Sequence, residues 1–120
     1  MKYMLLIYHD EQAFDALTDA ERQQVYADYR QLIGELQAKG KYLLGDELQA
    51  TSTAQTVRVR DSKPLITDGP FAETREQLGG FFLIEVTDAA EANAIAARIP
   101  SALTGSIEVR PVVAIAEAAG

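Results

Sequence analysis

Two stretches of the chain carry large apolar side chains on both faces of the strand that each would form, and this constrains the fold most. In residues 2–9 the two alternating sets are Tyr3, Leu5 and Ile7, and Met4, Leu6 and Tyr8. Residues 80–86, Gly-Phe-Phe-Leu-Ile-Glu-Val, show nearly the same pattern. Burial on both faces is typical of the central strands of a sheet. We therefore expect these two segments to lie in the middle of one sheet.

A long amphipathic helix is predicted after the first strand. Thr18-Asp19-Ala20-Glu21 matches a capping box, and Gly40 suits the left-handed cap that ends a helix, so the helix should run to about Lys39. Its buried stripe follows the spacing of consecutive helical turns and comprises Val25, Tyr29, Leu32 and Leu36.

The remaining elements are shorter. We expect a strand at 41–44 that ends at Gly45-Asp46, a hairpin of 56–60 and 65–67 across a turn at 61–64, and a loop from Asp68 to Gly79. A second capping box at 88–91 begins a helix to about Ile99, ended by Pro100, and a last strand covers 107–110. The order β-α-β-β-(β)-β-α-β predicts an α+β fold, the ferredoxin-like split β-α-β sheet with two helices on one face.

Two helices can cover only one face of such a sheet. Each large apolar side chain left in water on the other face loses roughly 1.5–3 kcal/mol of the free energy that its burial would contribute to folding. The same face of a second copy is the economical cover, which predicts a homodimer with two sheets packed face to face. The alternative is a monomer in which residues 45–55 or the C-terminal tail fold over the sheet. We expect one domain over residues 1–112, followed by a tail at 113–120.

Composition excludes several classes of site and partner. The formal net charge of −7 opposes binding to nucleic acid or to an anionic membrane surface. The chain has no cysteine and one histidine, His9, so disulfides, thiolate nucleophiles and multi-histidine metal cages are excluded. No apolar run approaches the roughly 20 residues that span a bilayer, and residues 1–8 are too short for a signal sequence. We expect a cytoplasmic protein without a cofactor or a resident metal.

The most informative segment is residues 67–81, Thr-Asp-Gly-Pro-Phe-Ala-Glu-Thr-Arg-Glu-Gln-Leu-Gly-Gly-Phe. Its Asp68-Gly69-Pro70 start forms a tight turn, and Phe71 is expected to fix the loop to the core. Three charged side chains then precede two glycines that allow a close approach of the backbone; these are Glu73, Arg75 and Glu76. The segment is interpreted either as a polar turn or as a ligand-binding loop that comprises Gly69, Pro70, Phe71, Glu73, Arg75 and Glu76.

This segment closely resembles the DGPF-domain proteins, a branch of the YCII-related family. The resemblance extends to the opening Tyr3-Met4-Leu5-Leu6 and to Gly45-Asp46-Glu47-Leu48, and so covers roughly residues 1–112. It implies a dimeric α+β barrel, a bacterial origin, and a functional link to an extracytoplasmic-function sigma factor. It implies no specific activity.

The resemblance also reveals a departure from the family. In other YCII-like proteins a histidine on the first helix pairs with an aspartate near the end of the second. Here Tyr29 stands at the histidine position and Ile99 at the aspartate position, before Pro100. The dyad is missing, and the expected role of Tyr29 is core packing with a hydrogen-bonded hydroxyl.

Three residues are candidate acids or bases: His9, Asp46 and Asp68. His9 follows the first strand beside Asp10 and Glu11, where an imidazole near carboxylates suits a general base. Asp46 and Asp68 each end a predicted strand, and two carboxylates in one pocket can raise the pKa of one of them. The alternative roles are a surface histidine and two turn-forming aspartates. A metal at Asp46, Asp68 and Glu73 lacks a ligand-spacing motif.

Two functions follow from these candidates. The first is a small enzyme that binds a polar or anionic ligand in the barrel and performs proton abstraction or isomerisation. Arg75 would hold an anionic group through its planar guanidinium, unless it only pairs with Glu73 or Glu76. The second is a non-catalytic binding protein that acts in a sigma-factor pathway.

Overall fold

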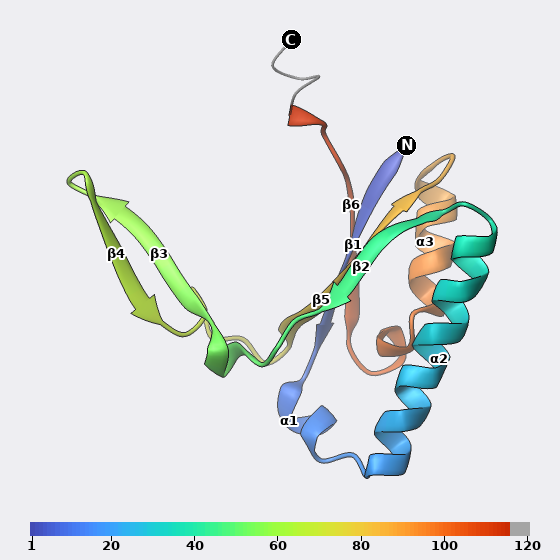
Figure 1. Ribbon diagram of the computed structural model, residues 1–120, viewed down its shortest axis with the longest axis horizontal. Coiled ribbons are helices and arrows are strands. Elements are labelled where there is room, and N and C mark those ends of the chain that lie inside the picture. The colour runs from blue at the N-terminus through green and yellow to red at the C-terminus, as the bar shows by residue number, and fades with distance from the viewer. Residues whose placement is uncertain (116–120) are drawn as a thin grey trace.

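The computed structural model describes residues 1–115 and shows a mixed α+β protein with two antiparallel sheets and three helices. Two long helices, α2 (Asp19–Ala38) and α3 (Ala89–Arg98), cover one face of a four-stranded sheet. A two-stranded hairpin projects from the other side of that sheet (Figure 1). The end of the predicted tail, residues 116–120, lies outside the described residues.

The four-stranded sheet has the order β2-β5-β1-β6, and every neighbouring pair is antiparallel. The strands are β1 (Lys2–His9), β2 (Tyr42–Glu47), β5 (Gln77–Glu85) and β6 (Ser106–Pro111). The two segments with apolar side chains on both faces are β1 and β5, and they pair with each other in the centre. The prediction of two central strands is confirmed.

The core lies between this sheet and the two long helices. Leu5 and Ile84 are fully buried in neighbouring strands, and Leu36 of α2 and Ile99 after α3 pack in the same cluster. The other alternating set of β1 and β5 points away from the helices and is only partly buried. We call it the open face; its large apolar side chains are Met4, Leu6, Tyr8, Leu44, Leu78, Phe81 and Leu83.

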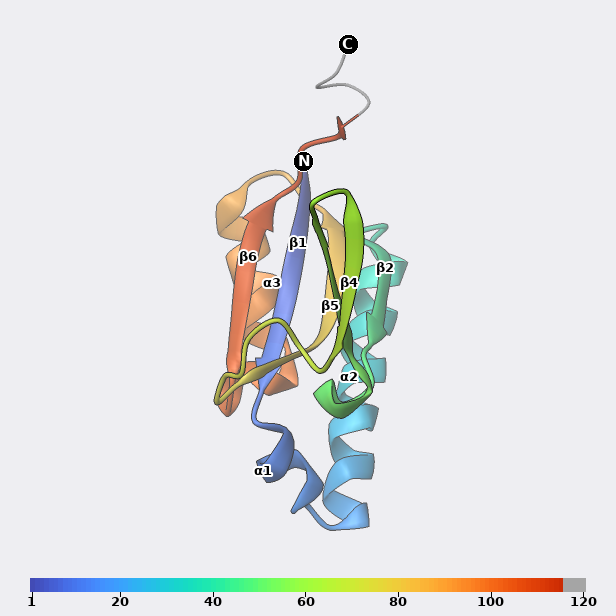
Figure 2. The same ribbon diagram turned by 90° about the vertical axis from the view of Figure 1, so that its left-hand side faces the viewer.

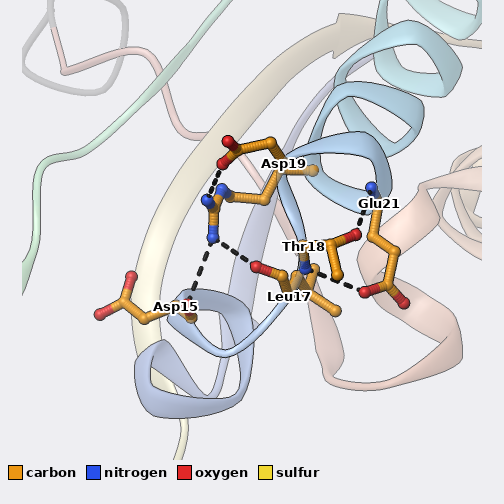
Figure 3. Close-up of polar contacts among 6 residues, drawn as sticks. Asp15, Leu17, Thr18, Asp19 and Glu21 are labelled. Atoms are coloured by element: carbon orange, nitrogen blue, oxygen red, sulfur yellow. Dashed lines mark hydrogen bonds and ion pairs between the residues drawn. The ribbon is translucent and has the colours of Figure 1, made fainter.

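Helix α2 begins with the predicted capping box. The backbone N–H of Glu21 donates to the Thr18 hydroxyl at 3.1 Å, and the N–H of Thr18 donates to the Glu21 carboxylate at 2.9 Å (Figure 3). Arg22 strengthens this end, because its guanidinium reaches the Asp19 carboxylate and the Leu17 carbonyl oxygen. At α3 only half of the box forms: Asp88 accepts from the N–H of Glu91, whose carboxylate instead accepts from the N–H of Thr87.

Several boundaries differ from the prediction. A short helix, α1 (Glu11–Asp15), was not predicted, although Asp10 caps it by accepting from the backbone N–H groups of Gln12 and Ala13. Strand β2 continues to Glu47, and β5 begins at Gln77, before Gly79. Pairing with β5 carries β2 past Gly45, and pairing with β1 lets β5 begin before Gly79.

The hairpin comprises β3 (Gln55–Arg60) and β4 (Lys63–Asp68) and is called the arm. Its turn is Asp61-Ser62, both at positive φ, so Lys63 and Pro64 belong to the strand and not to the predicted turn. The arm lies on the side of the sheet opposite the helices in both views (Figure 2). Neither residues 45–55 nor residues 113–115 close over the open face (Figures 1 and 2), so the described residues do not provide the cover that the monomer alternative requires.

We predict that Thr18→Ala lowers the free energy of unfolding by about 1 kcal/mol, because the first turn of α2 loses a hydrogen-bond acceptor. Thr18→Ser keeps the hydroxyl and should change stability little. Urea unfolding followed by circular dichroism measures both variants. Equal stability of the alanine variant and the wild type would show that the capping box contributes nothing here.

Candidate functional site

A pocket of about 220 Å³ lies between α2 and the sheet, where β1, β2 and β5 approach α1. It is on the helix-covered side of the sheet, whereas the barrel interior was expected on the open face. Its walls are mainly apolar and include Ile7, Phe14, Val25, Ile33 and Phe82. A few polar side chains converge on it, namely His9, Tyr26, Tyr29, Arg30, Glu47 and Ser101. An apolar pocket with few convergent polar groups is the usual form of a small-molecule site.

His9 ends β1 and lies against two neighbours in the pocket wall. Its imidazole stacks on the Phe14 ring, with centroids 5.5 Å apart and planes 12° from parallel. On β5 the register shifts so that Ile7 pairs with Gly80 and Tyr8 with Leu78, which leaves Gly79 as a bulge. A Cβ atom at Gly79 would lie 2.5 Å from the Cε1 atom of His9. The bulged glycine therefore provides the space that the imidazole occupies.

The two carboxylates next to His9 in sequence do not pair with it. The Asp10 carboxylate caps α1, and the Glu11 carboxylate accepts from the backbone N–H and the hydroxyl of Thr51 at 2.9 and 3.1 Å. Among residues 1–115, no ion pair involves His9. The expected imidazole–carboxylate grouping is wrong, because the Asp10 carboxylate binds amides at the start of α1 and the Glu11 carboxylate binds Thr51.

The carboxylate that the structure brings to the pocket is Glu47. Its Oε1 atom accepts a hydrogen bond from the Tyr26 hydroxyl at 3.0 Å, so it lies on the helix side of β2. Burial, and then the neighbouring Glu47 carboxylate, raise the pKa of Tyr26 above its usual value. Tyr26 therefore remains protonated at neutral pH and donates to Glu47.

Asp46 contributes to the same wall, but its side chain points elsewhere. Gly45 faces the helix side, since a Cβ atom there would meet the Phe82 ring at 3.0 Å, and Glu47 reaches Tyr26 on that side. Side chains alternate along a strand, so the Asp46 carboxylate belongs to the open face with its partner Phe81. Asp46 and His9 thus share a pocket wall without both of their side chains entering it.

Tyr29 and Ser101 form the most buried polar pair of the pocket. Their hydroxyl oxygens are 2.6 Å apart and join α2 to the 3₁₀ turn Pro100–Leu103. Burial raises the pKa of Tyr29 above its usual value, although the Ser101 hydrogen bond opposes this shift. The Tyr29 ring also meets Phe82 edge-on with centroids 6.1 Å apart. The expected packing role with a hydrogen-bonded hydroxyl is confirmed, and the same hydroxyl borders the pocket.

Asp68 and the loop after it lie outside this pocket. Asp68 ends β4 on the arm, where its carboxylate accepts from the Gln55 side chain at 3.4 Å. Gly69 has a φ of 95°, which glycine adopts without strain, and its N–H donates to the Ala54 carbonyl oxygen at 2.7 Å. None of the six predicted ligand-binding residues of the loop lines the pocket; these are Gly69, Pro70, Phe71, Glu73, Arg75 and Glu76.

The charged and aromatic residues of the loop have other surroundings. Phe71 is 81% exposed, so the prediction that it packs on the core is wrong in the protomer. Glu76 accepts from the Ser106 hydroxyl at 2.8 Å and ties the loop to β6. No ion pair within residues 1–115 involves Arg75, and no cluster there has enough carboxylates and imidazoles to hold a metal ion.

Sequence reasoning missed three functional candidates: Tyr26, Glu47 and Ser101. Glu47 was noted only as part of a motif, and Ser101 follows a proline that was taken as a helix end. One signal was available for Tyr26, because it directly follows Val25 of the predicted helix stripe. No local pattern could show that these residues face the same cavity.

Comparison with known proteins shows what the chain is similar to. Residues 1–116 match the family described as the YCII-related domain. The chain is also similar to an uncharacterised protein of Rhizobium meliloti (strain 1021), with 37% identity over 113 residues, 92% of this chain and 91% of the relative. Separately, no helix in the described part of the chain has the length and apolar character needed to cross a membrane.

We predict that Gly79→Ala displaces the His9 imidazole from its stack on Phe14, because the new methyl group and the ring cannot share this space. The backbone should persist, since the ring is at the end of a side chain that can rotate. His9 is the only histidine, so its two carbon-bound ring protons are unambiguous in an NMR spectrum.

Gly34→Ala in α2 is the matched control, because a Cβ atom there meets nothing within 4 Å. This control should leave the His9 signals in place and stabilise the helix by roughly 0.5–1 kcal/mol. Unchanged His9 signals in Gly79→Ala would contradict the assigned packing.

Proposed function

The chain belongs to the YCII-related family, and from this premise and the geometry of the pocket we propose that it is a small proton-transfer enzyme. Its ligand would occupy the cavity between α2 and the sheet. The observation that carries the proposal is an imidazole without a carboxylate partner at the wall of an apolar cavity that also holds a half-buried tyrosine hydroxyl. Perturbed ionisable groups in an apolar cleft are typical of catalytic sites.

His9 is the proposed general base. A neutral imidazole can accept a proton from a bound ligand through an unprotonated ring nitrogen. The Phe14 ring and the Gly79 backbone fix its plane, which limits the directions from which a ligand can approach. The unprotonated ring nitrogen would take a proton from a carbon atom adjacent to a carbonyl group of the ligand.

Tyr29 is the proposed hydrogen-bond donor to the developing oxyanion. When His9 removes the proton, the electron pair of the carbon–hydrogen bond forms the carbon–carbon double bond of an enolate, and the carbonyl oxygen becomes negative. Ser101 can donate to the Tyr29 oxygen, which leaves the phenolic proton free to bind the enolate oxygen. The phenol of Tyr29 can donate at neutral pH, because a tyrosine is protonated there and burial raises the pKa of Tyr29 further. Return of the proton to a different carbon atom of a conjugated enolate completes an isomerisation. Where the proton on His9 is first replaced by one from solvent, its return to the original carbon completes an exchange.

The proposed substrate is a small, neutral, mainly apolar carbonyl compound. A cavity of about 220 Å³ is smaller than those of drug-sized ligands, and most of its wall is aromatic or aliphatic. The Glu47 carboxylate and the net charge of −7 disfavour an anion, although Arg30 is one opposing positive charge in the wall. These features favour a neutral ligand over the anionic one expected from Arg75.

The alternative function is that of a non-catalytic binding protein that acts in a sigma-factor pathway. Membership of the DGPF branch would favour it through the functional link to a sigma factor that the resemblance implies. The loop at 68–76 is its natural site, because this loop is exposed and lies apart from the pocket. A protein without proton-transfer activity on any carbonyl probe would favour this alternative.

We also propose that the working form is a homodimer in which a second copy covers the open face. The order β2-β5-β1-β6, with α2 and α3 on one face, supports the ferredoxin-like split arrangement and, through the paired sheets, the dimeric α+β barrel. The partly exposed apolar side chains of the open face supply the driving force for this pairing.

We predict that the protein accelerates deuterium exchange at the α-carbons of cyclohexanone and cyclopentanone in D₂O. His9→Gln should reduce the protein-dependent rate at least tenfold, since a general base typically contributes 10²- to 10⁴-fold. Loss of the α-proton signals in one-dimensional NMR spectra measures the rate. Thermal melting of the variant establishes that it remains folded.

Asp68→Asn distinguishes the two candidate sites in the same assay. Normal exchange in this variant is expected, because Asp68 does not border the cavity. Loss of exchange in Asp68→Asn, with His9→Gln active, would move the site to the arm and overturn the proposal. Absence of exchange in the wild type would overturn proton transfer for this ligand class.

We predict a solution mass of about twice the chain mass of 13.1 kDa. Multi-angle light scattering behind size exclusion measures it at micromolar concentration. A mass equal to one chain would contradict the proposed homodimer and leave the pocket chemistry intact.

A further inference from the structure

The arm is an amphipathic hairpin without extensive packing against the other described residues. Val57 pairs with Ile66, and Val59 with Pro64, so these four side chains share one face. The opposite face carries Arg58, Arg60, Lys63 and Leu65. Every strand residue of the arm except Thr56 is exposed, and extensive packing of β3 and β4 involves only each other. A lone two-stranded hairpin is at best marginally stable in water, so the apolar face requires a partner.

The root of the arm is fixed, which defines where the arm projects. Glu11 holds Thr51 through two hydrogen bonds, and the Leu48 N–H donates to the Gly79 carbonyl oxygen at 2.8 Å. From this root the arm extends on the side of the open face, apart from the sheet (Figures 1 and 2). A second copy seated on the open face therefore lies within reach of the arm.

The surface area of the chain agrees with such an arrangement. The radius of gyration is 16.5 Å, whereas a compact domain of this length has about 14 Å. The accessible surface is 8314 Å², against roughly 6,400 Å² for a monomer of this mass. The excess, on the order of 1,900 Å², is well above the roughly 800 Å² that each partner buries in a standard interface.

From these observations we propose that the apolar face of the arm, Val57, Val59 and Ile66, packs against a second copy of this chain, so that two copies exchange arms reciprocally. The inference rests on the proposed homodimer and adds to it a specific contact surface. The cationic face with Arg58, Arg60 and Lys63 stays in solvent. A second copy is the favoured occupant because the arm and the open face lie on the same side of the molecule. In a two-fold symmetric dimer, one interface therefore buries both surfaces of each copy.

The first test compares two neighbouring residues on opposite faces of the arm. Ile66 is 62% exposed and Leu65 is 50% exposed in the protomer, so lysine is tolerated at both positions if the arm has no partner. We predict that Ile66→Lys raises the dimer dissociation constant at least tenfold, because an interfacial isoleucine becomes charged. Leu65→Lys should leave the constant within about twofold. Analytical ultracentrifugation over a dilution series measures both.

The second test shows which chain the arm contacts. Ile66→p-benzoylphenylalanine, irradiated in solution, is expected to give a covalent adduct of twice the chain mass on a denaturing gel. The same photoreactive group at Leu65 should give far less of this adduct. A crosslink that stays within one chain would show that the arm folds onto its own protomer, and would overturn the proposal.

The outcomes separate this inference from the homodimer itself. A monomeric wild type overturns both. A dimeric wild type whose dissociation constant is unchanged by Ile66→Lys overturns arm exchange and leaves a dimer formed by the sheets alone. Weakening by Leu65→Lys instead of Ile66→Lys overturns the assigned face. In the crosslinking test, another outcome is that the photoreactive group at position 66 reacts only with added nucleic acid or with another added protein. That result would overturn the second copy as the occupant of this face.

Discussion

The pairing of β1 with β5 through apolar side chains on both faces is the constraint on which the other features depend. One set, with Leu5 and Ile84 at its centre, is sealed by α2 and α3 and forms the core. The other set, with Leu6 and Phe81, is only partly buried by residues 1–115. The helix side therefore supplies the stability of the protomer, and the open side supplies the drive for association. The arm lies on this second side.

Local signals allowed much of the fold to be predicted. The capping box at Thr18 and the alternation in β1 involve residues close in sequence, so the chain itself contains the information. Strand ends were less predictable, because β2 continues past Gly45 by pairing with β5, and β5 begins before Gly79 by pairing with β1, a strand distant in sequence. Phe71 was misassigned for a related reason: an aromatic side chain predicts burial, but it does not indicate whether its own protomer provides the cover.

The candidate site was predictable only in part. His9 was identified because a lone histidine at a strand end is conspicuous, and Tyr29 because of its place in the helix stripe. Their polar neighbours Glu47 and Ser101 come from β2 and from the turn after α3, and only the folded chain brings them to one cavity. Asp46 shows the limit most clearly. The sequence places it beside the cavity, yet strand alternation directs its carboxylate to the open face and that of Glu47 to the helix side.

The cavity itself follows from glycines at one end of the sheet. Further along β5, Phe82 and Ile84 fill the space below the helices, whereas Gly79 and Gly80 have no side chain to place there. Gly45 leaves a similar space in β2, which the Tyr42 hydroxyl group partly occupies. The imidazole of His9 occupies part of the volume that the bulged Gly79 leaves. Side chains at these positions would fill the end of the core, so the same residues that weaken the packing of the sheet create the space for a ligand.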